Sequence, residues 1–345
     1  MWCMLFLLTL IYIINGTHSL QCMDENNQPV DWFTAYKLPK LKHENGLINE
    51  GNAYLYMTSL NNSKWIYSNI SINSSNSLIG NSIASLYSTN EDIFHLLYND
   101  ETPSGTTNGD KGHTKGVVLS DKQSGIWLVH STPHFPADND YYFPKTGTTY
   151  GQSFLCLTLN MENLNEVGRQ LKYNEPNIYS VNVPKSLIEL IPELFDVANN
   201  KTVKSSPWYR KTIIQTKGNQ QFVSFAKSKY FGKDLYSAWV APTLQTDMFV
   251  ETWRKGPGNL PSNCGTKYKI NNVEEINLMN VTFSTTDDHS KWAVSESLDF
   301  SQWICIGDIN RQEHQLKRGG GTVCINNKNL STNYLKSIIK SEDCQ

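Results

Sequence analysis

The sequence predicts a mixed α/β protein built from two similar sheet-and-helix halves, each of which contributes to one shared site. The pattern His-x-Lys occurs at residues 113–115 in the first half and at 289–291 in the second. The interval from the first of these histidines to His134 equals the interval from the second to Asn310. Strand-like apolar runs follow both copies, and such matching layouts indicate duplicated supersecondary units. Because alternate residues of a strand share a face, each His would project beside its Lys.

Short apolar runs with partial alternation predict the strands of the two sheets. The Ser/Asn-rich segment 61–90 is expected to be rich in loops, and residues 101–111 are expected to form turns that lead to His113. The predicted strands are Ala53–Thr58, Trp65–Ser68, Gly116–Leu119, Ile126–His130, Phe154–Leu159, Ile213–Thr216, Phe222–Ala226, Trp292–Ser295, Trp303–Ile306 and Thr322–Ile325.

Two helices are predicted between the His-x-Lys copies. Residues 163–173 place Leu164, Val167 and Leu171 on one face, which is the spacing of an amphipathic helix. Residues 184–197 begin with a proline, a residue common in the first turn of a helix. We therefore divide the chain into a first half at 20–160 and a second half at 161–345.

Residues 1–19 predict a signal peptide, because the apolar run 4–14 is too short to cross a bilayer and small polar residues follow it. No second long apolar stretch occurs, so we expect a secreted or lysosomal protein with no membrane partner. The N-x-Ser/Thr sequons are expected to carry glycans in the secretory pathway. They begin at Asn61, Asn69, Asn73, Asn200, Asn280 and Asn329.

Six cysteines follow the signal peptide, and an even number in a secreted chain indicates disulfides. The sequence alone does not choose their pairing. A zinc site is disfavoured because no C-x-x-C occurs, and because Pro133 argues against a helix carrying His130 and His134. We therefore expect no metal and no other cofactor. The cysteines are Cys22, Cys156, Cys264, Cys305, Cys324 and Cys344.

Charge is distributed unevenly along the chain, although the formal net charge is only −2. Residues 201–233 hold lysines, an arginine and aromatic residues, without Asp or Glu. Such a stretch is typical of a groove that follows a phosphate backbone. The alternative is an ordinary pair of strands with lysines on the solvent face and aromatic residues in the core. The sequence leaves both interpretations open.

Two imidazoles and two ammonium groups in one site suit phosphoryl transfer. One His can attack phosphorus while the other protonates the leaving oxygen. The lysines would neutralise the charge that develops on the phosphate oxygens. We select His113 as the nucleophile, His289 as the general acid, and Lys115 and Lys291 as the stabilising cations; the exchanged histidine roles stay open. We interpret the histidines at 18, 43, 95 and 314 as structural.

The His-x-Lys copies belong to a larger set of short motifs that runs from about residue 20 to the C-terminus. The other motifs are Trp127-Leu128-Val129-His130-Ser131, Tyr150-Gly151-Gln152, Phe231-Gly232-Lys233-Asp234-Leu235-Tyr236-Ser237, Gly307-Asp308-Ile309-Asn310-Arg311 and Arg318-Gly319-Gly320-Gly321-Thr322. Through this set the chain resembles the deoxyribonuclease II family, acid endonucleases of lysosomes and secretions that have the phospholipase D superfamily fold. A single H-x-K would be weak evidence, whereas the complete set is specific.

The resemblance implies an endonuclease that cleaves DNA without metal through a phosphohistidine and leaves 3′-phosphate and 5′-hydroxyl ends. It implies a phospholipase D-like pseudo-dimer, with DNA as the partner and a homodimer left open. It also implies the disulfides Cys22–Cys156, Cys264–Cys344 and Cys305–Cys324. The candidate substrate-binding residues are His130, Ser131, His134, Asn310 and Arg311.

One position departs from the family pattern. His134 stands where the family has Asn, so a neutral amide is replaced by a group that can be charged at acid pH. An alternative function is therefore a catalytically weak or inactive secreted glycoprotein that binds nucleic acid or a host protein on the same scaffold. A phospholipase would need an apolar entrance, and the basic stretch 201–233 favours a polymeric anion instead.

Overall fold

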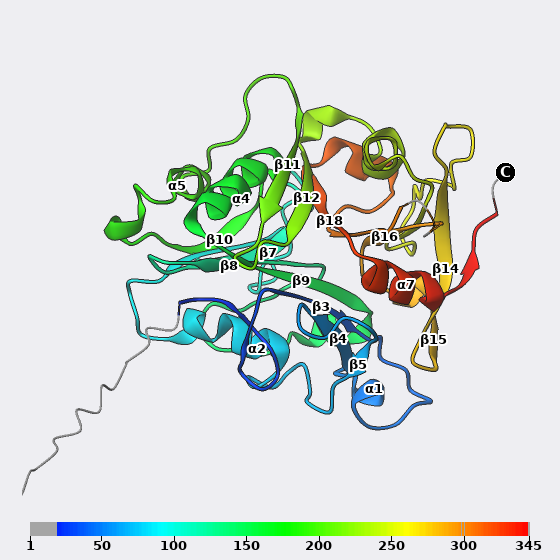
Figure 1. Cartoon of the computed structure of the whole chain (residues 1–345), viewed down its shortest axis with the longest axis horizontal. Coiled ribbons are helices and arrows are strands. Elements are labelled where there is room, and N and C mark those ends of the chain that lie inside the picture. Colours follow the sequence, from blue (N-terminus) through cyan, green and yellow to red (C-terminus); the bar gives the residue numbers. More distant parts are fainter. Residues whose placement is uncertain (1–18, 298, 300, 344–345) are drawn as a thin grey trace, which may run out of the picture.

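The computed structural model describes residues 19–297, 299 and 301–343, and two large β-sheets form its centre (Figure 1). Of the predicted signal peptide, only Ser19 falls within the described residues. The predicted mixed α/β class is confirmed. Within the described residues, no helix is long and apolar enough to cross a membrane.

The first sheet has eight strands in the order β10-β6-β7-β8-β9-β3-β4-β5, and every neighbouring pair is antiparallel. Strand β10 comes from beyond residue 160, so the first sheet extends past the predicted boundary between the halves. The strands are β3 (Trp32–Lys37), β4 (Tyr54–Thr58), β5 (Ile66–Tyr67), β6 (Phe94–Asn99), β7 (Lys115–Ser120), β8 (Gly125–His130), β9 (Gln152–Leu159) and β10 (Ile178–Asn182). A separate two-stranded sheet pairs β1 (Cys22–Met23) with β2 (Pro29–Val30).

The second sheet has the order β11-β12-β18-β17-β16-β13-β14-β15, with β19 paired to β14. Its pairs are antiparallel except β13 with β14. The strands are β11 (Tyr209–Gln215), β12 (Gln221–Lys227), β13 (Met248–Glu251), β14 (Ile270–Leu278), β15 (Val281–Ser284), β16 (Trp292–Ser295), β17 (Trp303–Gly307), β18 (Gly320–Asn326) and β19 (Ile338–Ser341).

Helix α4 (Met161–Asn174) contacts strands of both sheets, and α7 (Lys328–Ser337) packs on the second. The side chain of Asn160 caps α4 by accepting a hydrogen bond from the backbone of Asn163. The other α-helices are α1 (Gly46–Glu50), α2 (Leu78–Ile83), α3 (Lys145–Thr149), α5 (Pro192–Ala198) and α6 (Ala241–Leu244). Shorter helical turns are η1 (Ala84–Tyr87), η2 (Lys185–Leu187), η3 (Lys229–Phe231), η4 (Tyr236–Val240), η5 (Thr285–Asp287) and η6 (Glu313–Lys317).

The two sheets share one hydrophobic core. Trp32 of β3 meets Phe222 of β12 with ring centroids 6.3 Å apart, and Trp292 of β16 meets Tyr334 of α7 at 5.1 Å. Burying a large apolar side chain contributes about 1.5–3 kcal/mol. This shared core therefore fixes the two sheets against each other, which the site between them requires.

Every strand predicted from the sequence is present, with ends shifted by one or two residues, or by up to four in β11. The helix expected at 163–173 is confirmed as α4, with its three apolar positions buried. The single helix expected at 184–197 is wrong, because it divides into η2 and α5, and Pro192 starts the latter. A proline disfavours helical geometry at the residue before it, so the chain breaks at Ile191. Segment 61–90 also contains α2 and η1, which the loop prediction missed.

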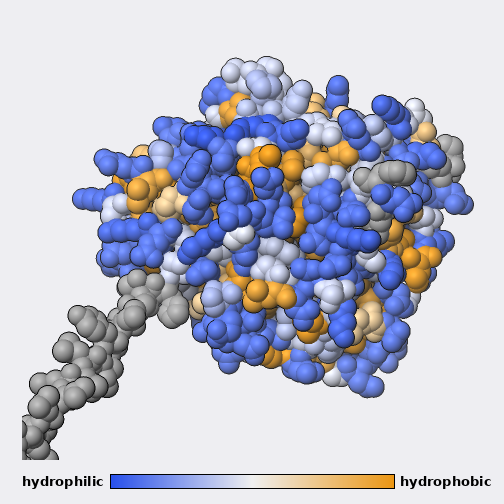
Figure 2. Space-filling model, in the orientation of Figure 1, coloured by the Kyte–Doolittle hydropathy of each residue, from blue (hydrophilic) through white to orange (hydrophobic). Residues whose placement is uncertain are grey.

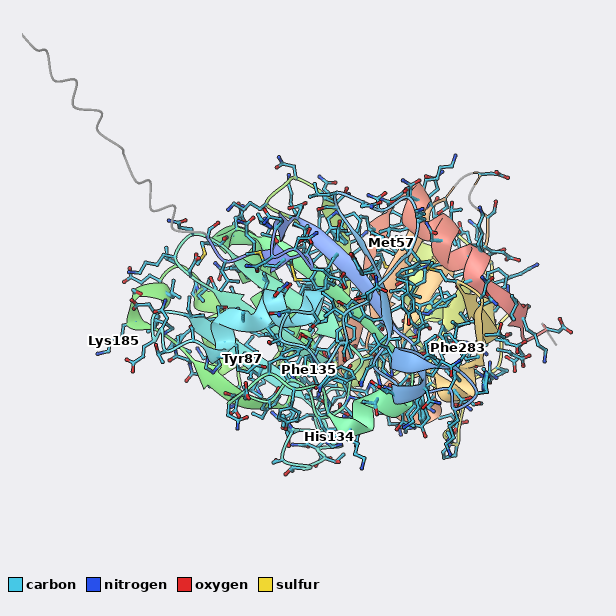
Figure 3. The ribbon with its side chains drawn as sticks, turned by 90° about the horizontal axis from the view of Figure 1, so that it is seen from below. Met57, Tyr87, His134, Phe135, Lys185 and Phe283 are labelled. Carbon is cyan, nitrogen blue, oxygen red and sulfur yellow. A yellow bond between two sulfur atoms is a disulfide. The ribbon has the colours of Figure 1, made fainter. Side chains whose placement is uncertain are left out.

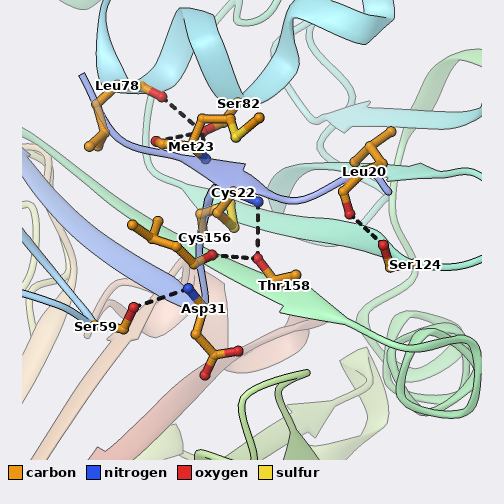
Figure 4. Close-up of a disulfide and its surroundings, with 11 residues drawn as sticks. Leu20, Cys22, Met23, Asp31, Ser59, Leu78, Ser82, Ser124, Cys156 and Thr158 are labelled. Carbon is orange, nitrogen blue, oxygen red and sulfur yellow. Dashed lines mark hydrogen bonds between the residues drawn. A yellow bond between two sulfur atoms is a disulfide. The ribbon is translucent and has the colours of Figure 1, made fainter. Parts of the chain in front are cut away.

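Two of the three implied disulfides are present, Cys22–Cys156 and Cys305–Cys324. The third involves Cys344, which lies outside the described residues. Figure 4 shows the first disulfide beside Thr158, whose hydroxyl accepts a hydrogen bond from the backbone N–H of Cys22 at 3.0 Å. This disulfide ties the N-terminal strand β1 to β9 in the middle of the first sheet.

Hydrophilic side chains cover most of the face in Figure 2, with apolar residues scattered among them. The asparagines of the six predicted glycosylation sites are exposed. Glycans at these positions would extend into solvent without disturbing the core.

Candidate active site

A cleft of about 470 Å³ is lined by residues from both halves of the chain, and both His-x-Lys histidines border it. His113 is 6% exposed and His289 is 9% exposed, so their rings are reached only from the cleft. The lining residues are Asp100, Glu101, Thr107, His113, Pro133, His134, Thr146, Tyr150, Trp253, Gly256, His289, Asn310, Gln312, His314, Gln315 and Arg318.

Each of these histidines is anchored to the opposite half by its backbone. The N–H of His113 donates to the carbonyl oxygen of Gly319 at 2.8 Å, and the N–H of His289 donates to that of Gly151 at 2.9 Å. Gly319 directly precedes β18, and Gly151 directly precedes β9. A Cβ atom at either glycine would lie 2.3 Å from another oxygen atom, so glycine is required for both close approaches.

Each imidazole ring is likewise oriented by a carbonyl group from the other half of the chain. Nδ1 of His113 lies 2.6 Å from the carbonyl oxygen of Asp308, at the end of β17. Nδ1 of His289 lies 3.0 Å from the carbonyl oxygen of Ser131, at the end of β8. A carbonyl oxygen only accepts hydrogen bonds, so Nδ1 carries the hydrogen in both rings. The lone pair of each neutral ring is therefore on Nε2.

The two lysines do not line the cleft. Lys115 is buried and forms an ion pair with Asp100. The Nζ atom of Lys291 lies 2.5 Å from the carbonyl oxygen of His289 and 3.1 Å from Nδ1 of its ring. Burial and the charge of Lys115 lower the pKa of Lys291 to about 7. The site therefore holds concentrated positive charge without full solvation.

This environment keeps the histidines neutral. Burial lowers the pKa of His113 well below its usual value, and Lys115 lowers it further, whereas Asp100 opposes the shift. Burial also lowers the pKa of His289 well below the usual range, with Lys291 and Lys115 acting in the same direction. A buried imidazole beside cations loses its proton readily, because water no longer solvates the charged form.

Asp100 is the acidic centre of the first half of the site. Its carboxylate contacts Lys115, lies 3.0 Å from Nη2 of Arg318 and 4.0 Å from Nε2 of His113. Burial by itself would raise the pKa of Asp100, but these positive partners hold it below its usual range. The carboxylate therefore stays ionised and fixes both cations.

His134 and Asn310, which stand at equal intervals after the two His-x-Lys patterns, both border the cleft. The backbone of His134, labelled in Figure 3, is left-handed, with φ at 59°, and its Nδ1 lies 2.7 Å from the carbonyl oxygen of Thr102. Asn and His are both enriched in this conformation, so the backbone here accommodates either residue. Asn310 keeps a buried Oδ1 with no hydrogen-bond partner among the described residues.

Three other predicted substrate-binding residues do not line the cleft. His130 is fully buried, stacks on Phe154 with centroids 5.9 Å apart, and has a pKa lowered to about 3 by burial and by Lys115. Ser131 acts through its carbonyl, which orients His289. Arg311 is buried, and its guanidinium contacts Asn272 and Asp234.

Sequence reasoning missed several residues that line the cleft. Asp100 and Glu101 follow strand β6, which was not predicted, and their position after an apolar run was the available signal. Tyr150 and Arg318 appear in the family motifs, but no role was assigned to them. Trp253 carried no signal. His314, interpreted as structural from the sequence, also borders the cleft.

The basic stretch 201–233 forms the β11–β12 hairpin and η3. Arg210 pairs with Glu166 at 2.6 Å, and Lys227 is buried with Nζ 3.0 Å from the carbonyl oxygen of Gln315. None of these residues lines the cleft, which favours the interpretation as ordinary strands. Within the described residues, no group of three or more His, Cys, Asp or Glu side chains is placed to hold a metal ion.

Residues 21–344 match the family model described as Deoxyribonuclease II. Among similar proteins, plancitoxin-1 of Acanthaster planci is 38% identical, over 100% of this chain and 98% of its own length. Deoxyribonuclease-2-alpha of Mus musculus is 39% identical, over 89% of this chain and 88% of its own. Deoxyribonuclease-2 of Caenorhabditis elegans is 35% identical, over 97% of each.

Among solved structures, the yeast tyrosyl-DNA phosphodiesterase aligns with a TM-score of 0.29 at 10% sequence identity. The alignment covers 63% of this chain and 67% of that one.

Proposed function

The chain belongs to the deoxyribonuclease II family, and from this premise we propose that it is an acid endonuclease that hydrolyses phosphodiester bonds of DNA without metal. One observation carries the proposal. Two histidines from different sheets border one cleft, and each is oriented through Nδ1 so that Nε2 holds the lone pair. Such a pair of imidazoles can supply both the nucleophile and the general acid for phosphoryl transfer through a covalent intermediate.

In the proposed reaction, Nε2 of His113 attacks phosphorus and the bond from phosphorus to the 5′ oxygen breaks. Protonated His289 gives its proton to that oxygen, so the products of the first step are a 5′-hydroxyl strand and a phosphohistidine. Neutral His289 then takes a proton from water, and the resulting hydroxide displaces His113 from phosphorus. The second product is the 3′-phosphate strand, and both histidines return to their starting states.

The lysines supply charge in this scheme. Lys115 and Lys291 are buried, and both lower the pKa of each histidine, so their positive charges reach the site where negative charge builds up on the phosphoryl oxygens. Their burial strengthens this effect because low local polarity weakens screening.

The lowered histidine pKa values support an acidic optimum. Both imidazoles are neutral near pH 7, so the acid form that His289 needs is populated only as the pH falls. A bound phosphate anion favours the protonated imidazole and moves its pKa upward again. Activity should therefore rise from neutral pH towards acid pH.

We also propose that the two sheets form a phospholipase D-like pseudo-dimer. Four neighbouring strands of each sheet, β6-β7-β8-β9 and β13-β16-β17-β18, follow the chain in the same order, and all of their neighbouring pairs are antiparallel. In each sheet two strands from earlier in the chain continue this path with antiparallel pairing, although β3 and β4 follow in chain order and β12 and β11 in reverse order. The crosswise contacts of the two histidines support the same relation. A secreted or lysosomal location is proposed as well, and the exposed sequons and the disulfides support it.

The test is incubation of the purified protein with plasmid DNA at pH 5 in EDTA. We expect nicking and linearisation, with products that a 3′-phosphatase converts into primers for a polymerase. Full activity only with added Mg²⁺ at pH 8 would overturn the proposal. Tight binding of DNA without cleavage at any pH would instead support the second candidate, the binding glycoprotein, which His134 at the family Asn position favours.

A further inference from the structure

Two aromatic side chains border the cleft directly beside His289. Trp253, two residues after β13, lies with its ring centroid 4.7 Å from that of His289 at an interplanar angle of 73°. Tyr150, the residue after α3, meets Trp253 at 4.5 Å and 83°. All three rings line the cleft. The proposed transfer of the phosphoryl group requires neither Trp253 nor Tyr150.

Polar groups at this pair are available to a ligand. The indole N–H of Trp253 donates no hydrogen bond to any residue that the structure describes, although the side chain is half-buried. Nζ of Lys255 lies 3.0 Å from the hydroxyl of Tyr150 and 5.1 Å from its ring centroid. Lys255 itself is exposed, so its charge faces solvent at the mouth of the cleft.

We propose that Trp253 and Tyr150 form a subsite that receives one unstacked nucleobase next to the scissile phosphate, with Lys255 facing the following phosphate of the strand. This inference rests on the proposed nuclease function. Aromatic surfaces with a cation at their edge are the common means of holding single-stranded nucleic acid, because every base offers a face for stacking.

The reaction scheme fixes which base it is. His289 protonates the leaving 5′ oxygen, and the aromatic pair lies on the His289 side of the cleft. The base in this subsite is therefore that of the nucleotide 3′ to the cleaved bond. A duplex must first unstack this base, at a cost that a single strand does not bear.

The experiment is a double-mutant cycle between the protein ring and the substrate base. The substrates are two single-stranded oligonucleotides with one cleavable phosphodiester, the other linkages being methylphosphonates. One is intact and one has an abasic site directly 3′ to that bond. The proteins are the parent chain, Trp253→Leu, and the control Trp208→Leu, which removes an indole that does not line the cleft.

In the parent and in the control, we expect the abasic site to lower kcat/KM about 5- to 100-fold, the range for loss of one base–aromatic stack. Trp253→Leu should already cleave the intact substrate slowly, and the abasic site should lower its kcat/KM by less than about twofold. An abasic site placed 5′ to the bond should have little effect in all three proteins.

Equal costs of the abasic site in the parent and in Trp253→Leu would overturn the proposal, since Trp253 would then only support His289. A cost found at the 5′ position instead would also overturn it as stated. If the parent cleaves no DNA, the nuclease function fails, and the same cycle is measured as binding affinity for the two oligonucleotides. Additive losses of affinity would then reject the subsite independently.

Discussion

His113 and His289 meet the cleft through matching backbone contacts, yet the charges around them differ. The carboxylate of Asp100 lies 4.0 Å from Nε2 of His113 and also holds Lys115. Lys291, the matching cation of the second half, has no ion pair with a carboxylate among the described residues, and its Nζ contacts only atoms of His289.

The matching backbone contacts thus fix where the two imidazoles lie, while local charge sets how readily each takes a proton. A nearby carboxylate favours the protonated form of His113, which is the form that a general acid needs and a nucleophile must lose. The comparison therefore bears directly on which histidine attacks phosphorus.

The largest effect should come from removing either ring. His113→Ala and His289→Ala should each lower kcat on DNA by more than about 10³-fold, and the double variant should be no worse, because the two act as one unit. Wild-type rates in either variant would show that the cleft is not the active site.

A p-nitrophenyl phosphodiester, whose leaving group needs no proton, separates the two roles. His289→Ala should still release a burst of nitrophenol and trap the phosphohistidine, whereas His113→Ala should not. The reverse result would assign the attack to His289.

The lysines should separate catalysis from stability. Lys115→Ala and Lys291→Ala should each cost on the order of 2.7–4 kcal/mol of transition-state stabilisation at pH 5. Only Lys115→Ala should also destabilise the fold, by about 3 kcal/mol, because it leaves Asp100 buried with fewer positive partners. Denaturant unfolding measures the second effect, with exposed Lys211→Ala as the control. Equal losses of folding stability in Lys115→Ala and Lys291→Ala would show that the ion pair with Asp100 does not distinguish the two lysines.

A smaller difference between the two sheets concerns the ends of β8 and β17. Strand β8 ends at the buried His130, whereas β17 ends at Gly307, which cannot titrate. The pKa of His130 in the folded chain is about 3, below its unfolded value of about 6.5. Its neutral form therefore contributes fully above about pH 6.5, and the contribution declines as the pH falls towards that folded value.

Between pH 7 and pH 5 this loss is on the order of 2 kcal/mol. His130→Gln, which keeps a hydrogen-bond acceptor, should lose that much less stability over the same interval. Parallel stability curves for the variant and the parent would contradict the assignment.

The smallest effect is expected from making the two halves alike at the cleft. His134→Asn matches Asn310 and suits the left-handed backbone, so the fold should be unchanged. Replacing this imidazole by a neutral amide removes a group that would repel the catalytic imidazolium when charged. The acidic limb of the pH–rate profile should therefore move upward, by less than about one unit. If the two profiles superimpose, His134 does not act on the titrating histidine, and the argument for a binding-only protein loses its main support.

The sequence alone determined where many of the strands lie and which two histidines belong to the site. Short continuous apolar runs predict strands that are buried on both faces of a sheet, and for this reason β7, β8, β16 and β17 were found correctly. The duplicated His-x-Lys pattern singled out the two histidines before any contact was known. The disulfides followed from the family resemblance, since cysteine spacing does not specify pairing.

Only the tertiary structure decided the surroundings of those histidines. The carbonyl groups of Ser131 and Asp308 orient the rings from far along the chain, and backbone carbonyls carry no sequence signal. Arg311 was predicted to bind substrate, but the sequence does not specify whether a side chain just past a strand end turns towards the cleft or towards the core. In the structure it turns inward to Asp234. Local patterning sets which residues lie in a strand. Which distant groups then meet depends on how the two sheets pack, and that is a property of the whole core.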